Sequence, residues 1–127
     1  MLLDTHVILW ALSNDSRLSD KAIVTIKRAE TKFYSSVNLW EIGIKLGLNR
    51  DDFQLQPDWS RSILQIMTLH RFKRIGIEPN HCERVAELPQ HHKDPFDRML
   101  IAQAIELQCP IISCDEKFDQ YKIQRIW

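Results

Sequence analysis

The stretch from His91 to Ala104 constrains the fold of this chain more than any other. It reads HHKDPFDRMLIAQA and combines a polar approach, a helix start and an apolar helix. Asp94 is placed as an N-cap, and Pro95 takes the first helical position, where a missing N–H costs nothing. Apolar residues then recur at helical spacing, which predicts a buried helix over Pro95–Gln108. Because the first turn of that helix carries Asp97, the pattern indicates a charged site at a helix N-terminus.

Short apolar strands alternate with helices through the rest of the chain. We expect strands over Met1–Leu3, Lys32–Ser35, Phe72–Ile77, Pro110–Ser113 and part of Lys122–Trp127. We expect further helices over Thr5–Leu12, Ser19–Glu30, Asn38–Leu46, Asp58–Leu69 and Pro79–Leu88, and a polar loop over Asn49–Pro57. This alternation predicts an α/β layer fold with a mostly parallel sheet.

Length and composition predict one ordinary globular domain over residues 1–127. The chain is 44% hydrophobic and 27% charged, and it has no apolar run approaching the ~20 residues of a bilayer span. We therefore expect no membrane span, and the N-terminus lacks the pattern of a signal peptide. The three cysteines form no CxxC pair, which favours a reducing, cytoplasmic environment.

The net charge of zero withholds the basic footprint that nucleic-acid binders often show. One local basic patch, residues 71–74 (RFKR), either faces a phosphate chain or forms a solvated turn before a strand.

Four acidic residues fall at strand ends or helix starts on one edge of the expected sheet. Asp4 ends the first strand, and Asp115 directly follows the fourth. Glu41 lies in the first turns of the helix after the second strand, and Asp97 lies in the first turn of the apolar helix. Ligands of open α/β sheets bind outside the carboxyl ends of the strands, so we expect these side chains to converge there.

Each acid also has a purely local interpretation. Asp4 would cap the first helix, and Asp115 would begin a turn. Glu41 stands three residues after Asn38, where it would close a capping box, while Asp97 would complement a helix dipole. These interpretations do not explain why all four acids lie on one edge.

Four carboxylates without a matching base would repel one another and lose ionisation. A hard divalent cation removes that conflict, since Mg²⁺ and Mn²⁺ take oxygen ligands. We therefore expect a site for Mg²⁺ or Mn²⁺ that supports phosphoryl transfer or phosphodiester hydrolysis. His91 and His92 precede the apolar helix, but without a Cys or third His at ligand spacing they support a zinc site only weakly.

Three other enzyme classes fit the sequence poorly. A dinucleotide-binding enzyme needs a glycine-rich turn after the first strand, and the three glycines stand at 43, 47 and 76. A phosphatase with an aspartyl nucleophile needs a second Asp where His6 stands. A phospho-receiver module needs a clustered acidic pair before its first helix, whereas Asp4 stands alone.

Four segments of the chain together resemble one family: LLDTHVILWAL, SSVNLWEIGIKLGL, HHKDPFDRMLIAQA and SCDEKFDQY. In the same order, they are similar to the PIN-domain ribonucleases, and in particular to the VapC-type toxins of bacterial toxin–antitoxin modules. The resemblance covers nearly the whole chain. It implies a PIN-like three-layer α/β/α sandwich around a mostly parallel sheet, a homodimer, and cleavage of RNA that depends on Mg²⁺ or Mn²⁺.

The resemblance also implies roles for individual residues and a partner. The family's acidic metal-binding positions are matched by Asp4, Glu41, Asp97 and Asp115. Ser113 matches a small hydroxyl residue that positions water or the acids. A small VapB-like antitoxin is expected to inhibit the enzyme from a groove over the acids. The alternative is a PIN-like module that binds RNA or a partner without cleaving RNA, but its signature would be the loss of an acid.

Several residues of these segments keep more than one interpretation. Asp94 is interpreted as the helix cap, and Asp119 is the alternative to Asp115. Arg98 would bind phosphate, hold a neighbouring acid or form a surface ion pair. Candidates for a dimer or antitoxin surface are Trp10, Leu39 and Trp40, although tryptophans at helical spacing favour the core.

Overall fold

The computed structural model describes residues 1–48 and 55–127. Five strands in these residues form one sheet with the order β3-β2-β1-β4-β5, and every pairing is parallel. The strands are β1 (Leu2–Leu3), β2 (Lys32–Ser35), β3 (Phe72–Ile75), β4 (Ile111–Ile112) and β5 (Arg125–Ile126). The helices are α1 (Thr5–Ser13), α2 (Asp20–Arg28), α3 (Ser36–Gly47), α4 (Trp59–Leu69), α5 (Pro79–Glu87), α6 (Pro95–Glu106) and the 3₁₀ helix η1 (Glu116–Gln120).

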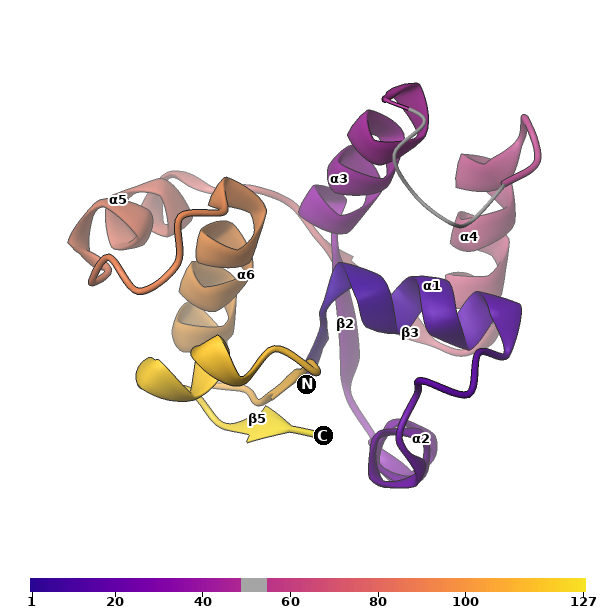
Figure 1. The fold of residues 1–127 in the computed structure, drawn as a ribbon, viewed down its shortest axis with the longest axis horizontal. Coiled ribbons are helices and arrows are strands. Elements are labelled where there is room, and N and C mark those ends of the chain that lie inside the picture. The colour runs from indigo at the N-terminus through magenta and orange to yellow at the C-terminus, as the bar shows by residue number, and fades with distance from the viewer. Residues whose placement is uncertain (49–54) are drawn as a thin grey trace.

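The sheet is the middle layer of three, because successive strand residues point to opposite faces. Leu2 and Ile111 contribute to the core beneath α5 and α6, whereas Leu3 and Ile112 contribute to the core beneath α1, α2 and α4. Figure 1 shows the two groups of helices on either side of the sheet, with α3 at its upper end. The α/β/α sandwich expected from the sequence is therefore confirmed.

Capping chemistry sets the start of the buried helix α6. The Asp94 side chain accepts hydrogen bonds from the backbone N–H groups of Phe96 (2.8 Å) and Asp97 (3.4 Å), and Pro95 follows at the first helical position. The expected cap is confirmed. The helix ends at Glu106, two residues earlier than expected, where Leu107 forms the C-cap.

The strand expected within Lys122–Trp127 is confirmed as β5, but the sequence pattern did not predict the 3₁₀ helix η1 that precedes it. The third strand ends at Ile75 rather than Ile77. Part of the expected loop Asn49–Pro57 lies outside the described residues.

The strand order places the switch point of the sheet between β1 and β4. From β1 the chain proceeds to β2 and β3 on one side, and it then crosses back to add β4 and β5 on the other. Open α/β sheets bind ligands at such a point, beyond the carboxyl ends of the strands. Asp4 follows β1 there, and Ser113 follows β4.

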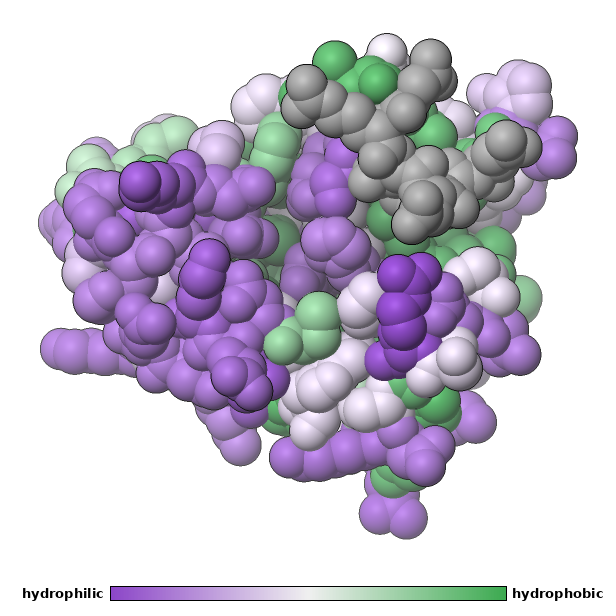
Figure 2. Space-filling view, viewed as in Figure 1, coloured by the Kyte–Doolittle hydropathy of each residue, from purple (hydrophilic) through white to green (hydrophobic). Residues whose placement is uncertain are grey.

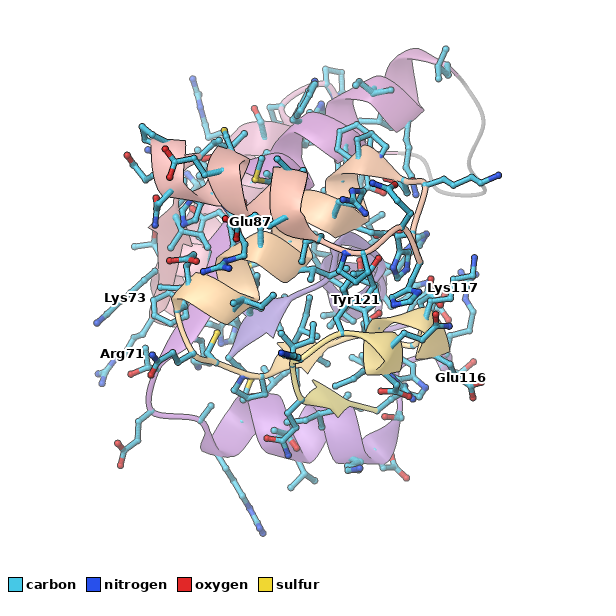
Figure 3. All side chains as sticks on the ribbon, turned by 90° about the vertical axis from the view of Figure 1, so that its left-hand side faces the viewer. Arg71, Lys73, Glu87, Glu116, Lys117 and Tyr121 are labelled. Carbon is cyan, nitrogen blue, oxygen red and sulfur yellow. The ribbon has the colours of Figure 1, made fainter. Side chains whose placement is uncertain are left out.

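The basic patch lies away from this switch point. Arg71 immediately precedes β3, so it lies at the opposite end of the strand from the carboxyl ends. Figure 3 shows Arg71 and Lys73 pointing outward on the other side of the molecule from Lys117 and Tyr121. The three basic residues of the patch are exposed, whereas Phe72 packs against the core, and the patch does not border the switch point.

None of the helices in residues 1–48 and 55–127 is both long and apolar enough to cross a membrane. The three cysteines, all of which are described, are free thiols.

Candidate functional site

Asp4 is buried at the switch point and is held by a serine from the neighbouring strand. It is 3% exposed and stands at the N-cap position of α1, but its side chain makes no cap hydrogen bond. Instead its Oδ2 accepts a hydrogen bond of 2.7 Å from Ser113 Oγ. Ser113 Oγ in turn accepts one of 3.1 Å from the backbone N–H of Asp115. Ser113 thus joins the ends of β1 and β4.

Glu41 faces the same point from α3 and is 5% exposed. The capping box of α3 is formed by Ser35 and Asn38, so the interpretation of Glu41 as the closing residue of that box is wrong. Glu41 accepts a hydrogen bond from Thr5 Oγ1 and forms an ion pair with Lys45 Nζ at 3.2 Å. Asn38 Nδ2 donates to the same threonine oxygen at 3.0 Å, which fixes the contact.

The carboxyl group of Asp97 is strongly affected by the other charges of the site. Burial and the surrounding negative charges raise its pKa from 3.8 to about 8. Those charges, in descending order of effect, belong to Asp4, Asp94, Glu41 and Asp115. Within the described part of the chain, no hydrogen bond to its carboxylate oxygens is found. The fold therefore brings together the four acids that the sequence placed on one edge.

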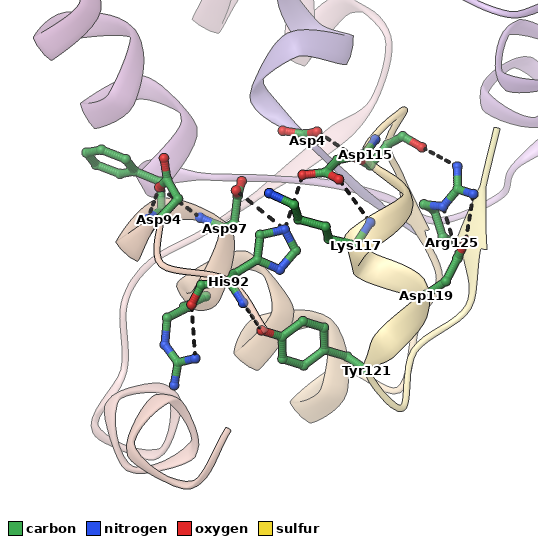
Figure 4. Close-up of polar contacts among 12 residues, drawn as sticks. Asp4, His92, Asp94, Asp97, Asp115, Lys117, Asp119, Tyr121 and Arg125 are labelled. Carbon is green, nitrogen blue, oxygen red and sulfur yellow. Dashed lines mark hydrogen bonds and ion pairs between the residues drawn. The ribbon is translucent and has the colours of Figure 1, made fainter. Parts of the chain in front are cut away.

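His92 also lies at this point, and the sequence reasoning had not included it among the site residues. Its Nε2 is 3.2 Å from Asp115 Oδ2 and 3.7 Å from Asp97 Oδ2, and the side chain is 3% exposed (Figure 4). His92, Asp97 and Asp115 offer donor atoms that lie within 4.8 Å of one another. The only sequence signal was its place two residues before the helix cap Asp94.

Asp115 is held at both carboxylate oxygens. Oδ1 accepts a hydrogen bond of 2.9 Å from the backbone N–H of Lys117, so the residue also begins η1, as the local interpretation expected. Burial acts to raise its pKa, but this hydrogen bond and the contact with His92 outweigh burial and lower it. Asp115 therefore presents an ionised carboxylate of fixed orientation.

Two other sequence alternatives are placed elsewhere. Asp119 forms a two-point ion pair with Arg125, with N–O distances of 2.9 and 2.7 Å, and it lies in η1 on the side turned away from Asp97 (Figure 4). Arg98 was expected to bind phosphate, an acid or a surface partner, and all three expectations are wrong. It is 8% exposed and donates to backbone carbonyl groups of Val85, Leu88, Pro89 and His92.

Trp40 is exposed, although tryptophans at this spacing were expected in the core. Its side chain is 54% exposed and packs edge-on against Phe96 at 5.0 Å between ring centroids. Ile44 and Leu48 follow it at helical spacing and are exposed as well. In Figure 2 apolar atoms reach the surface near the upper end of α3. Leu39 is only half-buried, against the core beneath α1.

Trp10 instead lines an apolar cavity of about 370 Å³ between α1, α2 and α4. None of the four acids lines this cavity. It is therefore separate from the acidic site.

The donor set of the acidic site suits a hard divalent cation. Asp4, Glu41 and Asp115 lie close enough to Asp97 for their charges, together with its burial, to raise its pKa, so a cation would relieve this repulsion. Carboxylate oxygens are the ligands that Mg²⁺ and Mn²⁺ prefer. Of these four acids, Asp97 and Asp115 have carboxylate oxygens within 4.8 Å of each other, whereas Asp4 and Glu41 are not part of that group.

Comparisons with known proteins agree with this architecture. Residues 1–124 match the PIN domain. Over 126 residues the chain is 26% identical to Ribonuclease VapC22 of Mycobacterium tuberculosis, a match that covers 98% of this chain and 94% of the relative.

Three solved structures have a similar fold. VapBC2 from Rickettsia felis, bound to a DNA fragment from its promoter, matches with a TM-score of 0.67 and 18% identity over 98% of this chain and 95% of that one. A toxin–antitoxin complex from Klebsiella pneumoniae matches with a TM-score of 0.64 and 18% identity over 95% and 92%. FitAB bound to IR36 DNA matches with a TM-score of 0.68 and 15% identity over 98% and 92%.

Proposed function

This chain belongs to the PIN domain family, and from that premise we propose that it is a metal-dependent endoribonuclease that cleaves RNA phosphodiester bonds. The observation that carries the proposal is the cluster of four acids at the switch point, with the pKa of Asp97 raised to about 8. A cluster of this kind destabilises a protein unless it binds a cation. Similarity to a ribonuclease over nearly the whole length supports RNA as the substrate.

The resemblance to the PIN family supports a role for each acid. Asp4 and Asp97 would anchor Mg²⁺ or Mn²⁺, while Glu41 and Asp115 would complete the coordination or orient the attacking water. Ser113 fixes the carboxylate of Asp4 by donating a hydrogen bond to it. When bound, a divalent cation would lower the pKa of a water molecule and offset the charge that develops on phosphate oxygens.

We further propose that the protein is the toxin of a toxin–antitoxin pair, a single domain over residues 1–127 that works in the cytoplasm. Its partners would be a small VapB-like antitoxin and a second copy of the chain. The support is its similarity to a VapC ribonuclease and to the fold of toxin–antitoxin complexes. The exposed apolar stripe Trp40, Ile44 and Leu48 gives such a partner an apolar surface to cover.

Cleavage of total cellular RNA by the antitoxin-free protein tests the nuclease directly. The reaction is run with Mg²⁺, Mn²⁺ or EDTA, and new 5′ ends are mapped by sequencing. Asp97→Asn removes one acid of the site. Asp119→Asn is the matched control, because it removes an equal charge that is paired with Arg125 outside the site.

Discrete new ends that need metal, persist in Asp119→Asn and vanish in Asp97→Asn would support the nuclease and identify its substrate. Metal-independent ends would refute the proposed mechanism. If the protein binds RNA but cleaves none of it under any condition, it is better described as an RNA-binding module.

A further inference from the structure

His92 contacts the acidic site through one ring nitrogen and leaves the other without a partner. Nε2 lies 3.2 Å from Asp115 Oδ2 and 3.7 Å from Asp97 Oδ2. Nδ1 is buried and has no hydrogen-bond partner among the described residues. A lone pair on Nε2 would be repelled by two carboxylates, so the contacts assign a proton to Nε2. His92 therefore donates to Asp115.

The unpartnered Nδ1 argues against a role as metal ligand. Histidines that bind a metal through one nitrogen almost always donate the other N–H to a carboxylate, a carbonyl or water. A metal on Nε2 would leave a proton on the buried Nδ1 with no protein acceptor among the described residues. With the proton on Nε2, Nδ1 is unprotonated and leaves no N–H group without an acceptor.

The ring of His92 is fixed by aromatic packing. It stacks on Tyr121 at 5.5 Å between centroids, with 25° between the planes, and meets the edge of Phe118 at 4.9 Å. The backbone N–H of His92 donates to the Tyr121 hydroxyl at 2.7 Å, and that hydroxyl donates to the Pro89 carbonyl at 3.3 Å (Figure 4). Tyr121 thus holds the ring of His92 and also the backbone of the loop between α5 and α6 that contains His92.

Arg98, from α6, holds the same loop through hydrogen bonds to its backbone. Its guanidinium donates to the carbonyls of Pro89 at 2.8 Å, Leu88 at 3.0 Å and Val85 at 2.8 Å, with a longer contact of 3.5 Å to His92. A buried guanidinium with only neutral carbonyl partners is costly to desolvate. The cost of burying Arg98 is explained if the loop between α5 and α6 must be fixed so that His92 keeps one position.

We propose that His92 is a positioning residue of the acidic site, which fixes the Asp115 carboxylate in the orientation needed for the divalent cation and the water. This role rests on the proposed nuclease function. Lys117 N–H holds one oxygen of Asp115 and His92 Nε2–H holds the other, so the carboxylate is oriented by two donors. Tyr121 and Arg98 act one step further away, through the loop.

Two variants separate hydrogen bonding from packing. His92→Phe keeps a ring between Tyr121 and Phe118 but cannot donate to Asp115. His92→Gln loses the ring but restores an N–H donor. His91→Phe is the matched control, because His91 is exposed and its ring contact is with Tyr121, a contact that a phenylalanine ring preserves. Mn²⁺ affinity is measured on the metal-free protein from the spin-resonance signal of free Mn²⁺, and the melting temperature of each variant shows that it is folded.

Loss of a partner that orients a metal ligand lowers metal affinity or activity by ~10–100-fold. We expect a loss of this size in His92→Phe, partial recovery in His92→Gln, and wild-type affinity in His91→Phe. With a cleaved RNA as substrate, His92→Phe should lower kcat by a similar factor. The Mn²⁺ complex of the wild type should show no directly coordinated ¹⁴N in spin-echo modulation.

Two results would overturn the positioning role. One is a folded His92→Phe that binds Mn²⁺ as tightly as the wild type. The other is a coordinated ¹⁴N signal that disappears in His92→Phe, since His92 would then be a ligand. If the wild type binds Mn²⁺ but cleaves no RNA, the proposed function fails, while the affinity series still decides the role of His92.

Discussion

Replacing Asp97 with asparagine should stabilise the metal-free protein at neutral and alkaline pH. The pKa of Asp97 is raised from 3.8 to about 8 in the folded protein, by burial first and then by the charges of neighbouring carboxylates. Between these two values the folded state binds more protons than the unfolded state. The stability of the wild type should therefore fall as the pH rises from about 4 to 8, and the part due to Asp97 is absent from the variant.

The size of the effect follows from the difference between the two pKa values. Each pH unit corresponds to ~1.4 kcal/mol, so the full difference sets an upper limit of ~6 kcal/mol. Water reaches the Asp97 side chain, which is 23% exposed, and screens the repulsion. The variant also loses a carboxylate from the first turn of α6, which costs ~0.3–1 kcal/mol in the helix dipole. We expect a net gain of about 1–3 kcal/mol at pH 8.

Thermal unfolding in EDTA at pH 5 and pH 8 measures this gain. For a chain of this size it corresponds to a melting temperature higher by about 3–10 °C at pH 8, with a smaller difference at pH 5. Asp58→Asn is the control, because Asp58 is exposed and its side chain makes no cap hydrogen bond. Adding Mn²⁺ should raise the melting temperature of the wild type more than that of Asp97→Asn. Equal or lower stability of Asp97→Asn at pH 8 in EDTA would refute the electrostatic account of the site.

Three further variants test the positions of single residues. Asp115→Asn should lower metal-dependent RNA cleavage by ~100-fold, while Asp119→Asn cleaves at nearly the wild-type rate; initial rates on one substrate decide between the two carboxylates. Arg98→Met should cost ~3–5 kcal/mol in urea unfolding, because it leaves several buried carbonyl groups without donors, and a loss below ~1 kcal/mol would contradict those contacts. Trp40→Ser should change the free energy of unfolding by only ~0.5 kcal/mol, as expected for a surface site, whereas a large loss would place this side chain in the core after all.

The sequence predicted the elements whose causes are local. The start of α6 depends on a cap and a proline that are adjacent in the chain, so Asp94 and Pro95 were assigned correctly. The alternation of strands and helices likewise predicted the parallel sheet, and with it the edge on which the four acids lie. The 3₁₀ helix η1 and the end of β3 were missed, because short segments carry too few residues for a periodic signal.

The partners of polar side chains were not predictable in the same way. His92 and Asp115 are 23 residues apart, and Glu41 meets Thr5 from a position 36 residues later. No spacing rule connects such pairs, because the fold alone brings them together. For the same reason Arg98 was expected to contact charged groups, although its actual partners are backbone carbonyls that leave no trace in the side-chain pattern.

The contacts also show why one acid dominates the electrostatics of the site. Glu41 has Lys45 and Thr5 as partners, Asp4 has the Ser113 hydroxyl, and Asp115 has two N–H donors. Among the described residues, Asp97 alone of the four acids receives no hydrogen bond of its own, and burial together with neighbouring charges raises its pKa to about 8. A bound cation would therefore relieve more repulsion at Asp97 than at any other acid. Removing this carboxylate should accordingly weaken Mn²⁺ binding while it stabilises the metal-free protein, and this opposite pair of effects would distinguish a metal ligand from a structural carboxylate.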